Sequence, residues 1–178
     1  MRTSIRPDEL ARLGRLTEEA FVCELGVGYL LLAGDLPIAL ELPGPTLSMR
    51  QARRGESQWT LDLERYFAGD PVTFELDLDA YGAVHGFTGF ELAVYKALAE
   101  VPYGRVVSYR DLAVAAGRPN AFRAVGSTMA RNALPVILPC HRVIKNDGRL
   151  GSYGDDPAWK ERLLAIEGVG VAEGRVTT

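Results

Sequence analysis

Cysteine and histidine are scarce in this chain of 178 residues, which contains two of each. A disulfide scaffold or a cysteine-rich zinc site needs more cysteines at closer spacing than Cys23 and Cys140 provide, so the sequence suggests neither. A Cys/His metal site would use nearly every candidate ligand, including His85 and His141. We therefore expect no metal and no cofactor, and we interpret Cys23 and His85 as structural residues.

Long apolar runs are also missing. The first residues, Met1 to Glu9, lack the apolar core of a signal peptide, and no apolar run approaches the roughly 18 residues of a membrane span. Hydrophobic residues make up 47% of the chain and charged residues 24%, which is ordinary for a soluble globular protein. The sequence therefore predicts a cytoplasmic protein without a membrane partner.

Acidic residues outnumber basic ones overall, but one segment reverses this balance. The chain has a net charge of −3, whereas Val101 to Leu150 holds eight basic and two acidic residues, a net charge of +6. A compact basic segment can present a face that binds a polyanion, because the local potential acts at the contact surface. The same residues could be scattered in solvent, so their place in the fold decides between the two interpretations.

The first half of the chain predicts a small α+β domain over residues 1–84. Two apolar runs separated by Gly34-Asp35 predict a β-hairpin, and a stretch with helical spacing follows. An alternating apolar and polar run then predicts a strand with one solvated face. The expected elements are a short helix around Pro7 to Leu16, strands at Tyr29–Ala33 and Pro37–Leu42, a helix at Gln58–Phe67 and a strand at Phe74–Asp79.

The second half predicts a mainly helical domain over residues 85–178, preceded by a linker at Gly82–Gly86. Apolar residues at helical spacing predict a helix from Phe90 to Val101. Ser108 and Asp111 then match an N-terminal capping pattern for the next helix, which we expect over Tyr109–Ala116.

A further helix is expected from Arg118 to Asn132, after a turn at Gly117. Two short helices separated by a glycine turn have the outline of a helix-turn-helix. The second helix carries Arg123 among small side chains, which suits close approach to a DNA groove. Small residues are equally typical of tight helix packing, so the outline alone leaves both interpretations open.

The segment Leu138-Pro139-Cys140-His141-Arg142 places one thiol between a proline and an imidazole. The thiolate is the nucleophilic form of cysteine, and a basic neighbour can lower the thiol pKa and raise the thiolate fraction. An isolated cysteine more often only packs in the core. The adjacent imidazole favours a reactive thiol, for which Cys140 is the candidate.

Several motifs in the second half occur in one order and at one spacing. They are Val101-Pro-Tyr-Gly-Arg-Val-Val-Ser-Tyr109, Arg123-Ala-Val-Gly126, Asn132, Pro139-Cys-His-Arg-Val-Ile144 and Gly151-Ser-Tyr153. With them, the chain from Thr88 to Gly168 resembles the O6-alkylguanine-DNA alkyltransferase family. The first half resembles that family only loosely, through Tyr66-Phe-Ala-Gly69.

The resemblance implies direct reversal of DNA damage by a suicide reaction. Family members rotate the alkylated guanine out of the stack, because its O6 substituent is hard to approach inside a duplex. The alkyl group then passes irreversibly to a cysteine, so each molecule acts once. The implied fold is a small N-terminal RNase H-like α/β domain followed by a mainly helical domain with a helix-turn-helix. The implied partner is double-stranded DNA containing O6-alkylguanine, bound through its minor groove by a monomer that can act cooperatively.

The resemblance also implies roles for residues of this chain. The catalytic residues would be Cys140 as alkyl acceptor, His141 as a base acting through a water, Glu167 as the carboxylate that orients it, and Asn132 as a brace before the cysteine segment. The DNA contacts would be Tyr109, Arg123, Ala124, Gly126, Ser127 and Arg142, with Arg123 filling the space of the flipped base. The substrate contacts would be Val143, Tyr153, Gly154 and Lys160.

The chain departs from the family pattern at two places. Asp155-Asp156-Pro157 stands where family members commonly have glycines, and Ala133 stands where they have a proline. Carboxylates beside a DNA-facing pocket repel phosphate unless they point away or pair with a cation such as Lys160 or Arg149.

Three other functions fit parts of the sequence. A lesion-binding alkyltransferase-like protein resembles the family but replaces the acceptor cysteine, and Cys140 argues against it. A helix-turn-helix regulator would usually dimerise, and the sequence has no obvious dimerisation helix. A thiol hydrolase would need ester- or peptide-binding features, which the sequence does not display.

Overall fold

The computed structural model describes residues 13–44, 53–154 and 156–177, and the chain forms two compact units. The described residues up to Gly86 belong to the first unit together with Ala133–Ile137. Phe87–Asn132 and the chain from Leu138 onward form the second unit. The expected domains meet between residues 84 and 85, and they differ from these units chiefly in the placement of residues 133–137.

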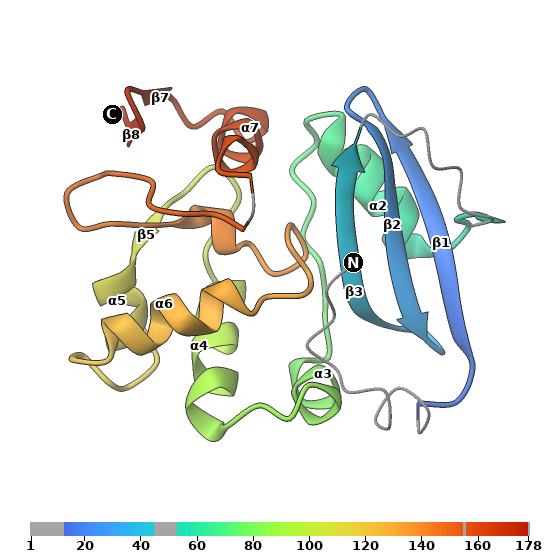
Figure 1. Ribbon diagram of the computed structural model, residues 1–178, viewed down its shortest axis with the longest axis horizontal. Coiled ribbons are helices and arrows are strands. Elements are labelled where there is room, and N and C mark those ends of the chain that lie inside the picture. The colour runs from blue at the N-terminus through green and yellow to red at the C-terminus, as the bar shows by residue number, and fades with distance from the viewer. Residues whose placement is uncertain (1–12, 45–52, 155, 178) are drawn as a thin grey trace. The chain divides into compact units, whose positions relative to one another are not determined.

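A four-stranded sheet with the order β3-β2-β1-β4 forms the centre of the first unit. Strands β1 (Leu16–Cys23), β2 (Gly26–Ala33) and β3 (Leu36–Gly44) form an antiparallel meander, and β4 (Arg53–Arg54) runs parallel to β1. The predicted hairpin is confirmed as β2 and β3. Strand β1, the third strand of the meander, was not predicted (Figure 1).

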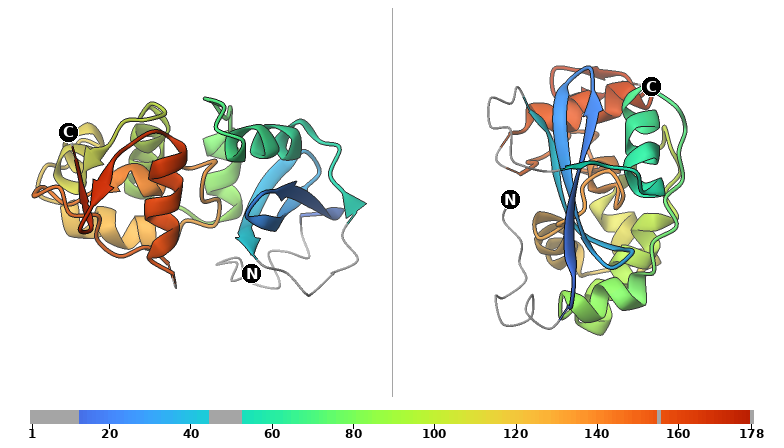
Figure 2. Two further views of the ribbon diagram at one scale, coloured as in Figure 1. Left: turned by 90° about the horizontal axis from the view of Figure 1, so that it is seen from above. Right: turned by 90° about the vertical axis from the view of Figure 1, so that its right-hand side faces the viewer.

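Helix α2 (Gln58–Phe67) covers one face of this sheet and matches its predicted range (Figures 1 and 2). The Ser57 side chain caps it by accepting a hydrogen bond from the Thr60 backbone N–H. Phe67 of α2 stacks on Phe21 of β1, with ring centroids 5.7 Å apart. The helix is therefore held on the sheet by aromatic packing in the core.

Two predictions for the first unit are wrong. Residues 74–79 form no strand, because the Asp77 side chain accepts from the Ala80 backbone N–H and begins α3 (Leu78–Val84) there. Gly82, expected in a linker, is a buried residue of that helix. The helix expected around Pro7 to Leu16 lies mostly outside the described residues, and Leu16 itself begins β1.

The second unit is built mainly from helices α4 (Gly89–Ala99), α5 (Tyr109–Ala115), α6 (Phe122–Ala130) and α7 (Ala158–Ile166). The predicted helices at α4 and α5 are confirmed, and the Ser108 side chain caps α5 by accepting from the Asp111 N–H. Helix α6 begins four residues later than predicted, because a turn occupies the chain after Gly117. Helices α5 and α6 lie next to each other (Figure 1).

Short strand pairs complete the second unit. Strand β5 (Val107–Ser108) pairs in parallel with β6 (Val143–Ile144), and β7 (Val171–Ala172) pairs with β8 (Arg175–Val176). The β5–β6 pair joins the residues directly before α5 to those directly after the Cys140 segment. This pairing fixes the start of α5 beside the cysteine segment.

No helix in the described part of the chain combines the length and apolar character that crossing a membrane requires.

Candidate active site

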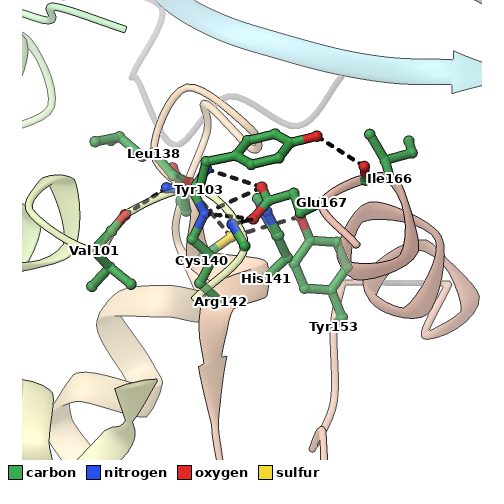
Figure 3. A network of polar contacts seen from close by, with 11 residues as sticks. Val101, Tyr103, Leu138, Cys140, His141, Arg142, Tyr153, Ile166 and Glu167 are labelled. Carbon is green, nitrogen blue, oxygen red and sulfur yellow. Dashed lines mark hydrogen bonds and ion pairs between the residues drawn. The ribbon is translucent and has the colours of Figure 1, made fainter. Parts of the chain in front are cut away.

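Cys140 begins a short 3-10 helix, η1 (Cys140–Arg142), and 7% of its surface remains exposed. Nδ2 of Asn132 donates to Sγ at 3.0 Å. Oη of Tyr153 lies 3.7 Å from Sγ (Figure 3). Asn132 closely follows the last residue of α6. The sulfur therefore lies near the end of the arginine-bearing helix, in contact with an amide and a phenol.

Burial raises the pKa of the Cys140 thiol above its ordinary value, because a low dielectric disfavours the thiolate. Hydrogen bonds with Asn132 and Tyr153 and the charge of Lys160 act in the opposite direction and offset part of this effect. The neighbours therefore act in the expected direction on the thiol pKa, but burial outweighs them. The net shift favours the protonated thiol over the thiolate.

His141 and Glu167 form a fully buried pair in which Nε2 lies 2.6 Å from Oε1. Burial opposes ionisation of Glu167, but hydrogen bonds from His141 and Arg142 hold its pKa at about 2. Burial lowers the pKa of His141 despite the carboxylate. Because Glu167 is ionised, Nε2 is the nitrogen that donates to it, and the neutral ring carries no proton on Nδ1. The pair therefore presents an imidazole that can accept a proton.

Arg142 lies in the interior, which contradicts its expected role as a DNA contact. Its guanidinium donates to both carboxylate oxygens of Glu167 at 2.9 to 3.2 Å and to the Val101 carbonyl at 2.6 Å (Figure 3). Only 8% of the side chain is exposed. Arg142 therefore balances the charge of Glu167 and cannot reach a phosphate.

Residues before α5 complete the surroundings of Glu167, and sequence reasoning had assigned them no role. The Gly104 N–H donates to Glu167 Oε2 at 3.0 Å, and Tyr103 Oη donates to the Ile166 carbonyl at 2.8 Å. Gly104 has a φ of +71°, and a Cβ there would lie 3.0 Å from the Glu167 carbonyl oxygen. The signal was present in the Pro-Tyr-Gly motif, whose glycine is needed for this close approach.

Lys160 is a buried cation in α7. Its Nζ donates to the Val143 carbonyl at 2.5 Å and lies about 6 Å from the ring centroids of Tyr109 and Tyr153. Burial lowers the pKa of Lys160 to about 8, and the thiolate form of Cys140 would oppose this shift. Lys160 therefore remains mainly protonated at neutral pH and connects the Cys140 surroundings to Tyr109.

A cavity of about 630 Å³ lies along α5 and α6, lined by residues of both helices and by the segments around Lys145 and Gly151. Tyr109 lines this cavity, and its Oη would lie 3.8 Å from a Cβ at Gly151. The cavity has cationic walls at Arg110, Arg123 and Lys145. It therefore offers a positively charged, mostly open recess next to Tyr109.

Comparison with known proteins identifies the family. Residues 89–169 match the family model for the DNA-binding domain of 6-O-methylguanine DNA methyltransferase. The chain is 39% identical over 157 residues to a methylated-DNA–protein-cysteine methyltransferase of Methanosarcina barkeri, an alignment that covers 82% of this chain and 94% of that protein. The chain belongs to the methylated-DNA–protein-cysteine methyltransferase family. The resemblance found in the sequence is confirmed.

Solved structures of this methyltransferase family share the mixed α/β fold. The crystal structure of Mycobacterium tuberculosis O6-methylguanine methyltransferase has a TM-score of 0.67 and 30% identity, covering 86% of this chain and 93% of that one. A structure of Mycobacterium tuberculosis OGT in complex with DNA has a TM-score of 0.68 and 30% identity, covering 85% and 93%. The fold class of the methyltransferase is thus confirmed at the level of a mixed α/β protein.

The DNA contacts expected for this methyltransferase lie mainly on α6. Arg123, Ala124 and Ser127 are exposed on its outer face, and Arg123, Gly126 and Ser127 line the cavity. A Cβ at Gly126 would lie 4.0 Å from Tyr109 Cε1. The structure therefore brings Tyr109 and the small-residue face of α6 together, while it separates Arg142 from them.

The loop after Tyr153 carries the departures from the family pattern. Gly154 is exposed with a φ of +47°, a left-handed conformation that suits glycine. Asp156 Oδ1 accepts from the Ala158 N–H at 2.9 Å at the start of α7, and Asp155 lies outside the described residues. The Asp156 carboxylate thus interacts with the start of α7. This agrees with the interpretation that it points away from the DNA phosphates.

Metal ligands do not gather in the described residues: no three side chains of His, Cys, Asp or Glu there are placed to hold an ion.

Proposed function

We propose that this protein repairs DNA by taking the alkyl group of O6-alkylguanine onto its own Cys140, once per molecule. The observation that supports this most strongly is the Asn132 amide, which donates to Sγ at 3.0 Å. A hydrogen bond from a neutral amide stabilises a thiolate without the charge of a full ion pair. The same hydrogen bond holds the sulfur in position for attack on the alkyl carbon.

The transfer is a displacement at the alkyl carbon. A bond forms between Sγ and that carbon while the carbon–O6 bond breaks, and the electron pair passes to the guanine. The guanine takes up one proton and is restored, and Cys140 becomes a thioether. A thioether does not hydrolyse, so the protein is consumed in the reaction.

The proton of the thiol needs an acceptor, and His141 supplies it in this proposal. Its ring is neutral and is oriented through Nε2 by Glu167, so Nδ1 can accept the proton through an intervening water. The ionised Glu167 then stabilises the imidazolium. The buried positive charge of Arg142 keeps the carboxylate ionised and limits the basicity of the imidazole.

Helices α5 and α6 would act as a helix-turn-helix, and the minor groove of the DNA would bind to their cavity face. The cations at Arg110, Arg123 and Lys145 supply phosphate attraction, and the small residues of α6 permit a close approach. Arg123 would replace the guanine that leaves the stack. All these groups belong to one unit of one chain, which supports a monomer acting on each lesion.

The substrate pocket would lie between Cys140 and the loop that carries Tyr153 and Gly154. The Val143 carbonyl already accepts from Lys160, and its second lone pair would accept from the guanine amine. For the first unit, an RNase H-like fold is supported by the antiparallel meander β1–β3 with α2 on one face.

The alternative is an alkyltransferase-like protein that binds lesions without repairing them. Such a protein lacks the acceptor thiol, whereas this chain holds Cys140 beside a hydrogen-bond donor and a base–carboxylate pair. The geometry therefore favours transfer.

The test is to measure O6-methylguanine in a duplex oligonucleotide after incubation with increasing amounts of protein. We expect the lesion to disappear in a one-to-one ratio with protein and unmodified guanine to appear in its place. Cys140→Ser should remove no lesion, while Cys23→Ser, which changes the other thiol, should behave as the parent does. Binding of the duplex without loss of the lesion would support the lesion-binding alternative.

A further inference from the structure

Phe122 stands out among the surface residues of this protein. It is 40% exposed, and the other large hydrophobic side chains that are similarly exposed in the described residues are aliphatic: Leu16, Val22, Leu25, Leu61 and Val114. A single exposed apolar residue is ordinary, but an exposed aromatic ring in a DNA-facing recess is a candidate for stacking. The place of Phe122 in the fold therefore decides what it does.

Phe122 is the first residue of α6 and lines the same cavity as Arg110 and Lys145. The neighbouring Arg123 holds its guanidinium carbon 5.9 Å from the centroid of the Phe122 ring. The next outward-facing residues of α6 are the small side chains Ala124 and Ser127. The ring and the guanidinium thus form a cation–π contact at the start of a helix whose other outward-facing side chains are small.

We infer that Phe122 is an apolar wedge that stacks on the base next to the everted guanine. This inference rests on the proposed function, because it assumes that α6 faces a duplex with one base rotated out. Proteins of the minor groove insert phenylalanine between base steps, and every base offers a flat face to an aromatic ring. Arg123 fills the vacated space, and Phe122 covers the exposed face of the neighbouring base.

The cation–π contact gives Phe122 a second effect on the same step. A guanidinium over an aromatic ring is held at modest energy near the surface. Arg123 is therefore kept near the tip of α6 before DNA arrives, and it changes from stacking on Phe122 alone to stacking within the duplex. Stacking by an aromatic ring tolerates any base, so the effect should be similar with a purine or a pyrimidine beside the lesion.

The test uses the full chain with Cys140→Ser, which holds the complex before transfer, and a duplex with 2-aminopurine next to O6-methylguanine. Unstacking of 2-aminopurine raises its fluorescence, and contact with the Phe122 ring changes that fluorescence. We expect Phe122→Ala to weaken binding on the order of tenfold and to abolish the fluorescence change. Phe122→Tyr should restore both. Val114→Ala, which shortens another exposed apolar residue on α5 outside the cavity lining, should change affinity less than about twofold.

A second variant reports on the ring itself. In Phe122→Trp the indole should be quenched when the duplex is added, with Trp59 and Trp159 supplying a constant background. Equal affinity and equal 2-aminopurine fluorescence for Phe122→Ala and its parent would overturn the inference, as would an unquenched indole in a bound complex. These outcomes are independent of catalysis. If the protein with Cys140 intact fails to remove the lesion while the Cys140→Ser parent still binds the duplex, the proposed function alone is contradicted. Failure of the parent to bind the duplex would contradict both.

Discussion

Nδ2 of Asn132 lies 3.0 Å from Sγ of Cys140 and 2.8 Å from the carbonyl oxygen of Leu138. Both amide hydrogens thus have acceptors, which fixes the orientation of the side chain without any charged group. The same amide holds the turn before the cysteine and faces the sulfur. Its effect on the thiol can therefore be separated from that of the buried cations.

Replacing Asn132 should raise the pKa of Cys140 further and slow the transfer. A hydrogen bond to a charged group contributes about 2 kcal/mol, so Asn132→Ala should lower the single-turnover rate by roughly 30-fold. The pKa can be followed by the ultraviolet absorbance of the thiolate in a Cys23→Ser background. An unchanged titration of Cys140 in the variant would show that the contact does not stabilise the thiolate.

The pH dependence of the thiol follows from its burial. Because the pKa of Cys140 is raised in the folded protein, the thiolate should form only above the ordinary pH range of a cysteine. The folded protein then loses stability as the pH rises from the unfolded thiol pKa through the folded one. A thiolate already present at neutral pH in the protein without DNA would contradict this account.

Glu167 should make the free energy of unfolding depend on pH in the acid range. Its pKa of about 2 lies below the ordinary value of 4.5, so the stabilisation is complete above the unfolded pKa and is lost as the pH falls toward 2. The shift corresponds to about 3 kcal/mol. Chemical denaturation between pH 6 and 2 should show this loss for the parent. In Glu167→Gln the acid-dependent part should be missing and the protein less stable at neutral pH.

Two arginines that both belong to family motifs should behave differently. Arg142→Ala should destabilise the protein by about 3–5 kcal/mol, because it leaves a buried carboxylate without its partner. Arg123→Ala should leave stability within about 0.5 kcal/mol, since its side chain is exposed, and should weaken duplex binding. Thermal unfolding and duplex titration measure the two effects. Equal destabilisation by both substitutions would be inconsistent with the buried position of Arg142.

Duplex binding should depend on salt through the cations of the cavity. Lys145→Ala should reduce the slope of log affinity against log salt by about one, because one phosphate contact is lost. Arg118→Ala provides a matched control on the same unit, since that guanidinium lies 5.2 Å from the Phe90 ring and does not line the cavity. If both variants show the same slope of log affinity against log salt, the DNA phosphates do not contact Lys145.

Sequence reasoning succeeded where local pattern and fold agree. Gln58–Phe67 has helical spacing and is α2, and Ser108 caps α5 as its position predicted. The segment Phe74–Asp79 alternates apolar and polar residues but pairs with no strand in the described part of the chain. Instead, the Phe74 ring packs parallel to Trp59, with centroids 6.4 Å apart. Strand β1 was missed because its stability comes from pairing along its length with β2.

The site shows the same division. The sequence motifs point to Cys140, His141 and Glu167 as site residues, yet they do not indicate the direction in which Arg142 points. Its partner Glu167 lies 25 residues further along the chain, so the burial of this arginine depends on how α7 is placed. The raised pKa of the thiol likewise depends on burial by several segments, which no local pattern contains.

Repair by this protein requires that Cys140 itself becomes alkylated. Mass spectrometry of the intact protein after incubation with a duplex containing O6-methylguanine tests it most directly. We expect a gain of about 14 Da, one methylene, carried entirely by the peptide that contains Cys140. An unchanged mass in protein that has removed the lesion, or a gain on the peptide containing Cys23, would contradict it.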